Sequence, residues 1–224
     1  MLAIIEYEAE HCIPSGYINI AIAASAPDGA WQKLERNEIQ LDEAFYKAFE
    51  ADIGAEKSWA AFHRARKLPV ATPAPRVDGE ALFWRMMAKG QQQDAVIVAA
   101  VQKLRASGRY VIGALTNDYA FPAGHPFSAG KPALKALFDV WVASSEIGSR
   151  KPEEGMYREA MRRAGIADGR QVAFCDDIGM NLRAAKKLGW RTVKVEIGGS
   201  RDAVRQLEIL TGLSLLDRAE RSRL

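Results

Sequence analysis

The sequence predicts an α/β protein, with a helical amino-terminal part followed by a parallel sheet that is covered by helices on both faces. From residue 94 onward, short continuous apolar runs alternate with amphipathic segments, as in parallel sheets whose two faces are both buried. Before residue 94, apolar residues recur mainly at helical spacing. The chain of 224 residues is long enough to bury one substantial core and a smaller appendage.

The first half is expected to be built from short helices. An amphipathic helix starts at Leu2 and closes near Pro14 and Gly16. A turn at residues 27–29 and the proline-containing connection LPVATPAPRVDG interrupt the helical pattern. The remaining helices are expected at 17–26, from Trp31 through the stripe Leu41, Ala44, Phe45, Ala48, Phe49 and Ile53, at 56–66 and at 80–89.

The second half alternates between strands and helices. Strands are expected at 110–115, 139–143, 171–175 and 191–195, and helices at 94–107, 153–165, 179–189 and 200–210. Ligands of parallel sheets bind at the carboxyl ends of the strands, so the residues that follow each strand are the candidates for chemistry.

Composition excludes several classes of function. The chain has 31 Lys and Arg against 28 Asp and Glu, and these charges are spread along it, so no nucleic-acid partner is expected. No apolar run reaches the length of a membrane span, so no membrane partner is expected either. Cys12 and Cys175 lack metal-ligand spacing and are interpreted as reduced structural residues.

The location of the protein is expected to be cytoplasmic, because no signal peptide is recognisable at the amino terminus. A peroxisomal location is the alternative. Ser222-Arg223-Leu224 at the carboxyl terminus is a conservative variant of the Ser-Lys-Leu address.

Polar residues follow three of the expected strands. Thr116 and Asn117 come after the first, Lys151 after the second, and Asp176 and Asp177 after the third. A hydroxyl and an amide can bond phosphoryl oxygens, a lysine can neutralise their charge, and a carboxylate can hold Mg²⁺. Taken singly, Thr116, Lys151 and Asp177 are ordinary turn and helix-start residues, but in this order they predict a phosphate and metal site.

Two residues of this region keep a second interpretation. Asp176 is either a carboxylate behind the metal ligand Asp177 or the N-cap of the helix at 179–189. Asn181 either orders the pair of aspartates or is an amide on the helix surface.

Three stretches resemble sequence motifs of one enzyme superfamily. ALTND, SSEIGSRKPEEGMYREAMRRAGI and VAFCDDIGMNLRAAKKLGWRTVKV are similar to the second, third and fourth motifs of the haloacid dehalogenase (HAD)-like superfamily. More narrowly, the three stretches resemble the phosphatase-like domain at the amino terminus of soluble epoxide hydrolases and its stand-alone fungal relatives. PDGAWQKLERNEIQLDEAFYKAFEADI resembles the helical cap of that group.

This resemblance covers residues 1 to about 212 and implies a Rossmannoid core with a cap. Residues 1–91 would form the amino-terminal helix and helical cap, residues 92–212 the α/β core, and residues 213–224 a basic tail. The implied catalytic residues are Thr116, Asn117 and Lys151, and the implied Mg²⁺ ligands are Asp177 and Asp176.

The first motif of the superfamily, an apolar strand that ends in a nucleophilic aspartate, has no counterpart in this sequence. The first aspartate of any kind is Asp28, within the stretch that resembles the cap. In the superfamily the missing strand is central, so the strands at 110–115 and 171–175 would face a gap. Either they close onto each other, or another segment fills the gap, or the native protein is longer. Mg²⁺ binding is expected to be weak or absent.

Three hypotheses about function follow. The first is a HAD-like protein, truncated or divergent, that lacks the nucleophile and does not catalyse by itself, but still binds a phosphate-containing small molecule or a partner. The second is an Mg²⁺-dependent phosphatase or related hydrolase whose amino terminus is truncated. The third is an interaction subunit, either a homodimer or a chain that receives a strand from a partner.

Overall fold

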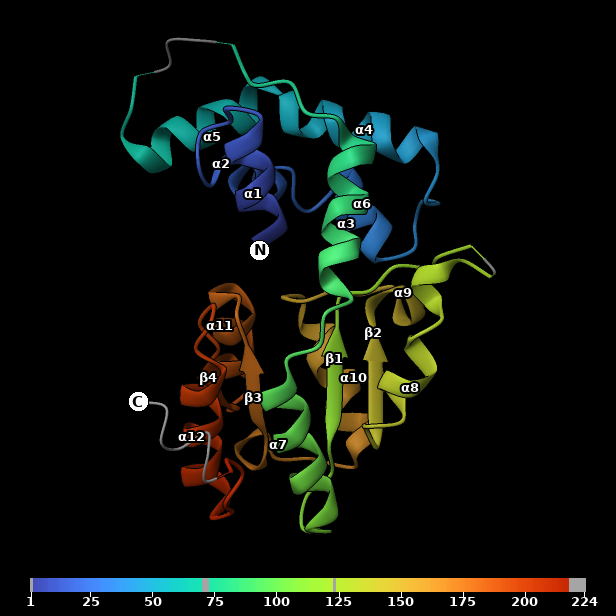
Figure 1. The fold of residues 1–224 in the computed structure, drawn as a ribbon, viewed down its shortest axis with the longest axis vertical. Coiled ribbons are helices and arrows are strands. Elements are labelled where there is room, and N and C mark those ends of the chain that lie inside the picture. Colours follow the sequence, from blue (N-terminus) through green and yellow to red (C-terminus); the bar gives the residue numbers. More distant parts are fainter. Residues whose placement is uncertain (1, 70–72, 123, 218–224) are drawn as a thin grey trace. The chain divides into compact units, whose positions relative to one another are not determined.

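The computed structural model describes residues 2–69, 73–122 and 124–217 (Figure 1). It divides into two compact units. Unit one contains the residues up to Gln92 together with Asp118–Ala129, and unit two contains Gln93–Asn117 and the residues from Gly130 onward. Within the described residues, no helix has the length and apolar character needed to cross a bilayer. The sequence Ser222-Arg223-Leu224 lies outside the described residues.

Unit one is helical, as the spacing of apolar residues predicts. Its elements are α1 (Leu2–Glu10), α2 (Tyr17–Ala24), α3 (Ala30–Glu35), α4 (Glu43–Gly54), α5 (Glu56–Arg66), α6 (Gly79–Gly90) and the 3₁₀ turn η1 (Pro126–Ser128). The helices α4 and α6 begin where an aspartate accepts a hydrogen bond from the first turn. Asp42 accepts from the Phe45 amide and Asp78 from the Ala81 amide, which satisfies a donor that would otherwise lack a partner.

Aromatic rings form the core of unit one. Phe83 lies at its centre, with its ring 5.4 Å from that of Phe45, 6.1 Å from that of Trp31 and 5.7 Å from that of Tyr119. Tyr119 belongs to the segment that follows the first strand of unit two in the sequence. Its contacts explain why Asp118–Ala129 groups with unit one.

Unit two contains four short strands and the helices that cover them. Its elements are α7 (Ala95–Ala106), β1 (Gly113–Thr116), α8 (Lys131–Lys135), β2 (Val140–Ala143), α9 (Ser144–Ile147), α10 (Glu154–Ala164), the 3₁₀ turn η2 (Gly169–Gln171), β3 (Ala173–Asp176), α11 (Gly179–Lys187), β4 (Arg191–Lys194) and α12 (Ser200–Thr211). The predicted α/β class with parallel strands is confirmed.

Two strands start two or more residues later than the apolar runs predict, and β2 starts one residue later, at Val140. The first begins at Gly113 rather than at residue 110, because its partner β2 begins only at Val140, the residue opposite Gly113. The third begins at Ala173 rather than at residue 171, because Asp168 accepts a hydrogen bond from the Arg170 amide and draws the chain into η2. Apolar runs mark buried backbone, but the partner strand decides where pairing begins.

The strands form two separate parallel pairs instead of one sheet. β1 pairs with β2, and β3 pairs with β4. The arrows of β1, β2 and β3 point the same way in Figure 1, and β4 runs parallel to β3; β1 and β3 lie on the inner side of each pair. No pairing joins β1 to β3 within the described residues, so these two strands have not closed onto each other.

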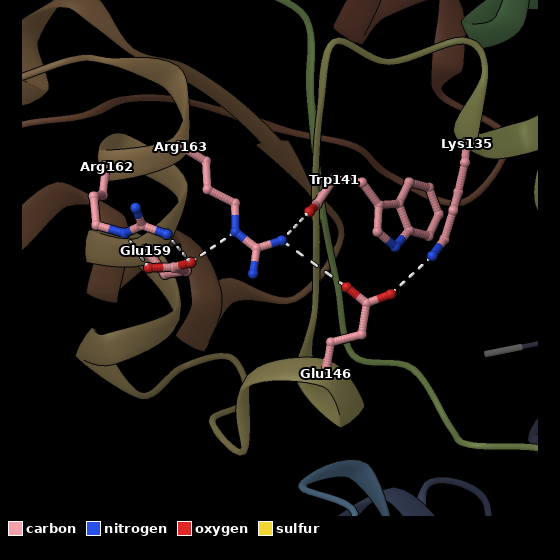
Figure 2. Close-up of polar contacts among 6 residues, drawn as sticks. All are labelled: Lys135, Trp141, Glu146, Glu159, Arg162 and Arg163. Atoms are coloured by element: carbon pink, nitrogen blue, oxygen red, sulfur yellow. Dashed lines mark hydrogen bonds and ion pairs between the residues drawn. The ribbon is translucent and has the colours of Figure 1, made fainter.

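The outer edge of β2 is covered by charged side chains (Figure 2). Arg163 of α10 donates a hydrogen bond of 2.6 Å to the Trp141 carbonyl and one of 2.7 Å to Glu159. Lys135 of α8 forms an ion pair of 2.8 Å with Glu146. The network therefore satisfies a backbone acceptor that an exposed edge strand would offer to another chain.

Gly169 is required by the close approach of two segments of unit two. A Cβ atom at this position would lie 1.9 Å from the Leu188 carbonyl oxygen and 2.9 Å from the Trp190 ring. The backbone before β3 and the loop before β4 thus lie too close together to admit a side chain.

Gly169→Ala is expected to lower the free energy of unfolding of unit two by about 1–3 kcal/mol, because the backbone must move to admit the methyl group. Gly130→Ala is the matched control, since nothing lies within 4 Å of its added Cβ. It should change stability by no more than about 1 kcal/mol. Denaturant unfolding followed by circular dichroism measures both, and equal effects would contradict this account.

Candidate functional site

The candidate site lies in unit two, where β1 and β3 end. Thr116 is the last residue of β1 and Asp176 is the last residue of β3. Both strands run in the same direction, so both residues lie at the carboxyl ends (Figure 1). Lys151 follows α9, which itself follows β2.

Asn117 fixes the backbone of Lys151. Its Oδ1 accepts a hydrogen bond of 2.8 Å from the Lys151 amide, and its Nδ2 donates one of 3.2 Å to the Lys151 carbonyl. One side-chain amide thus satisfies both polar backbone groups of a loop residue. The sequence predicts Asn117 as a group that contacts phosphoryl oxygens, whereas in the structure it positions the lysine.

Lys151 and Asp176 form a shielded ion pair. The Lys151 Nζ lies 2.8 Å from the Asp176 Oδ2, and the two side chains are only 13% and 4% exposed. The Lys151 Nζ also lies 5.7 Å from the centre of the Phe174 ring. Because shielding lowers the local dielectric, this pair is stronger than a surface pair and costs more to break.

The second carboxylate oxygen of Asp176 also accepts hydrogen bonds from protein groups. Oδ1 accepts hydrogen bonds of 2.8 Å from the Ile178 amide and 3.0 Å from the Asn181 Nδ2. The helix α11 begins at Gly179 and its N-cap is Ile178, so Asp176 is not the N-cap of this helix. Asn181 is 2% exposed and orders Asp176, so the interpretation of Asn181 as a surface amide is wrong.

The negative charge of Asp176 acts on two neighbouring groups. Burial, with a further contribution from Asp176, raises the pKa of the Cys175 thiol to about 11. Burial and the same carboxylate raise the pKa of Tyr157, whose hydroxyl donates to the Asn181 carbonyl at 3.0 Å. Cys175 is therefore a neutral thiol at physiological pH, and a neutral thiol is a poor nucleophile.

Thr116 and Asp177 lie at the margin of this cluster. The Thr116 hydroxyl is half-buried and donates to the Asn117 carbonyl at 3.2 Å. Asp177 is exposed and makes no hydrogen bond or ion pair within the described residues. The structure thus joins Asn117, Lys151 and Asp176 in one network, with Thr116 beside it and Asp177 apart from it.

A closed metal site does not fit these residues. No group of three or more His, Cys, Asp or Glu side chains able to hold a metal occurs in the described part of the chain. Both oxygens of Asp176 accept hydrogen bonds from protein donors, and Asp177 is a single exposed carboxylate. Mg²⁺ prefers octahedral oxygen coordination and keeps its waters unless several ligands converge.

The lysine is the group best able to bind an anion. An ammonium group has three N–H donors, and Lys151 uses one of them on Asp176. Two donors remain for an oxyanion. Sequence reasoning missed the supporting role of Tyr157, which only the fold reveals, whereas the role of Asn181 in ordering Asp176 was one of the two interpretations that the sequence left open. For Asn181, the available signal is its position two residues into the helix that follows the two aspartates.

Comparison with known proteins identifies relatives over most of the chain. A family model described as haloacid dehalogenase-like hydrolase matches residues 4–189. Acyl-CoA dehydrogenase family member 10 from mouse is 27% identical over 209 residues, which cover 93% of this chain and 17% of that protein. Bifunctional epoxide hydrolase 2 from pig is 34% identical over 83 residues, or 37% of this chain and 14% of that protein. The chain therefore spans less than a fifth of either relative.

A solved structure has the same fold. It is described as a predicted HAD-like family hydrolase from Porphyromonas gingivalis, and it matches with a TM-score of 0.53 and 18% sequence identity. The match covers 95% of this chain and 90% of that one. At this identity the likeness supports the fold alone.

Lys151→Ala is expected to lower the free energy of unfolding by about 3–5 kcal/mol, because it leaves the shielded Asp176 carboxylate without its charged partner. Lys194→Ala is the matched control, since the pair of Lys194 with Glu196 is exposed, and its effect should be below about 1 kcal/mol. Denaturant unfolding at neutral pH measures both. A similar decrease in the free energy of unfolding of the two variants would show that the Lys151–Asp176 pair stabilises the protein no more than an exposed pair does.

Proposed function

Because the chain belongs to the haloacid dehalogenase-like hydrolases, we propose that it binds a phosphate-containing small molecule at Lys151 and Thr116, with Asn117 positioning the lysine. We further propose that residues 1–224 do not hydrolyse phosphomonoesters on their own. The observation that carries the first part is the Lys151 ammonium group, which is held in place by Asn117 and Asp176 and keeps two donors for an anion.

The electrostatics of the cluster limit the affinity that we expect for an oxyanion. Asp176 compensates one positive charge of Lys151, so the pair as a whole is neutral. An incoming phosphate gains charge-assisted hydrogen bonds from the lysine but meets the field of Asp176. The single donor of the Thr116 hydroxyl is used on the Asn117 carbonyl at 3.2 Å, so it can serve the anion only by leaving this partner. We therefore expect modest affinity, with a phosphomonoester as the class of ligand.

The second part of the proposal follows from the nucleophile that phosphoryl transfer by an aspartate requires. The attacking carboxylate must have a free oxygen directed at phosphorus. Asp176 uses both oxygens on Lys151, Ile178 and Asn181, while Asp177 is an exposed residue apart from the network. The Cys175 thiol, with its pKa of about 11, is no substitute.

Without a nucleophile, positioning of the phosphate alone accelerates its hydrolysis too little for an assay to detect. Loss of the nucleophile in a well-studied hydrolase leaves a residual factor of about 10³–10⁴ over water. Phosphomonoester hydrolysis is among the slowest uncatalysed reactions, and enzymes that achieve it accelerate it by up to about 10²¹. A phosphate site that lacks a nucleophile should therefore act as a binding site.

Phosphate binding is tested by calorimetric titration of the purified chain with inorganic phosphate. Lys151→Gln keeps a donor for Asp176 but removes the charge, and should weaken binding about tenfold or more, as the loss of a charged hydrogen bond implies. Lys194→Gln, on the exposed part of β4, should leave affinity unchanged. The same samples should give no turnover of p-nitrophenyl phosphate above a buffer control. Turnover that disappears in Lys151→Gln would refute the proposed lack of activity.

Mg²⁺ binding is expected to be weak, with a dissociation constant of about 1 mM or larger, because a single exposed carboxylate cannot displace several waters from this ion. Titration of the chain with MgCl₂ in the absence of phosphate measures this constant. Asp177→Asn is compared with Asp202→Asn, which alters an exposed aspartate of α12 far along the sequence. Tight binding that is lost only in Asp177→Asn would contradict the expectation.

A further inference from the structure

Tyr157 is a fully buried residue of α10. Its ring makes edge-to-face contacts with the rings of Phe174 and Trp190, at centroid distances of 5.9 and 5.4 Å. These contacts fix the ring and thereby the hydroxyl, which donates to the Asn181 carbonyl at 3.0 Å. A buried hydroxyl that lost this acceptor would be left unsatisfied, so the packing around Tyr157 favours keeping the bond.

The Tyr157 hydroxyl begins a chain of hydrogen bonds that ends at Lys151. It donates to the Asn181 carbonyl, and the Asn181 Nδ2 donates in turn to the Asp176 Oδ1 at 3.0 Å. The Asp176 Oδ2 accepts from the Lys151 Nζ at 2.8 Å. Tyr157, Asn181 and Asp176 are all buried, so these bonds are stronger than bonds that compete with water. A displacement at the tyrosine therefore reaches the ammonium group of the lysine.

This chain joins two segments of unit two at two points each. One segment runs from Lys151 into α10, which carries Tyr157, and the other runs from Asp176 into α11, which carries Asn181. The ion pair joins the starts of the segments, and the hydroxyl-carbonyl bond joins their helices. A single contact would let the segments rotate about it, and the second contact removes that freedom. The direction of the lysine side chain thus depends on a residue of the helix that follows it.

The Phe174 ring connects Tyr157 to Lys151 by a second route. The tyrosine ring meets the Phe174 ring edge to face, and the Lys151 Nζ lies over the same ring, 5.7 Å from its centre. A cation in this place is attracted by the negative face of the ring. Tyr157 therefore supports the aromatic partner of the lysine as well as its carboxylate partner.

The Tyr157 hydroxyl acts as a hydrogen-bond donor and not as an acid. Burial, with a contribution from Asp176, raises the pKa of Tyr157, so the phenol keeps its proton at physiological pH. The bond to the Asn181 carbonyl consequently persists over the whole neutral range.

We propose that Tyr157 is a positioning residue for Lys151. Its hydroxyl holds Asn181, and Asn181 holds Asp176 in the orientation that receives the ammonium group. Without the hydroxyl, Asp176 keeps the Ile178 amide but loses part of its restraint, and Lys151 becomes more accessible. The consequence for ligand binding rests on the proposed phosphate site, whereas the placement of the lysine does not.

The first measurement is the rate at which acetic anhydride acetylates Lys151 in the full chain, followed by mass spectrometry in phosphate-free buffer. A lysine that is only 13% exposed and held at a carboxylate reacts slowly. Tyr157→Phe removes the hydroxyl and keeps the ring, and should raise this rate about threefold or more, as the loss of one hydrogen bond implies. Tyr110→Phe is the matched control, because the Tyr110 hydroxyl also donates to a backbone carbonyl of unit two, that of Thr211. It should leave the rate at Lys151 unchanged.

Lys103 in the same samples separates positioning from a general loosening of unit two. Its Nζ donates to the Leu215 carbonyl and to the Asp217 carboxylate, both at 2.7 Å. In Tyr157→Phe, the acetylation rate at Lys103 should equal that of the wild type. A rise by the same factor at both lysines would show that the hydroxyl only stabilises the unit, and would overturn the proposal.

A double-mutant comparison tests the route through Asn181. Asn181→Ala removes the Nδ2 donor to Asp176 and should itself raise the acetylation rate at Lys151. Adding Tyr157→Phe should raise the rate no further, because the hydroxyl then has no route to the lysine. Independent increases that multiply in the double variant would overturn the chain. Circular dichroism checks that each variant is folded, and Asn181→Leu, of similar volume, replaces Asn181→Ala if the latter fails this check.

Titration with inorganic phosphate distinguishes a failure of this inference from a failure of the proposed function. Where the wild type binds phosphate, Tyr157→Phe should weaken binding about threefold or more, and Tyr110→Phe should not. Unchanged acetylation and unchanged affinity in Tyr157→Phe would overturn the role of Tyr157 and leave the phosphate site standing. A wild type that binds no phosphate would overturn the proposed function, while the acetylation rates would still decide whether Tyr157 positions Lys151.

Discussion

The ion pair of Lys151 with Asp176 is the interaction on which the arrangement of the candidate site depends. It joins the residue that ends β3 to the loop that follows β2 and α9. Asn117, directly after β1, holds the backbone of the same lysine. Three segments far apart in the sequence are thus tied to one shielded carboxylate. Because an unpaired charge in such a place is costly, each neighbour of Asp176 also constrains the others.

Because its neighbours surround Asp176, the cluster is better suited to binding an anion than to nucleophilic attack on phosphorus. A nucleophile needs a lone pair that no protein group occupies, whereas a structural carboxylate is best when every lone pair is occupied. Asp176 meets the second condition, since Lys151, the Ile178 amide and Asn181 surround it. Burial, with a contribution from the charge of this carboxylate, raises the pKa of Cys175 and of Tyr157, so the acid and base chemistry available nearby is limited as well.

Much of the fold could be predicted from local patterns, while the site could be predicted only in outline. Helices such as α4 and α6 can be predicted from an aspartate that is followed by apolar residues at helical spacing. The residue types at the strand ends were also evident, since Thr116, Lys151 and Asp176 follow apolar runs. The contacts that these residues make with one another could not be predicted from the sequence. That Asn181 is buried and Asp177 exposed depends on how α11 leaves β3, and no spacing in the sequence encodes that direction.

The cover on the outer edge of β2 bears on how this protein can associate with others. Arg163 is anchored by Glu159 and occupies the Trp141 carbonyl, so a neighbouring molecule that approaches β2 from outside meets a bulky guanidinium group where it needs a free acceptor. A sheet can extend from one molecule to the next only if both molecules present an uncovered strand edge. Because Arg163 covers the outer edge of β2, molecules cannot pair through this strand into an open-ended fibre. A short sheet with an uncovered edge would be prone to such aggregation.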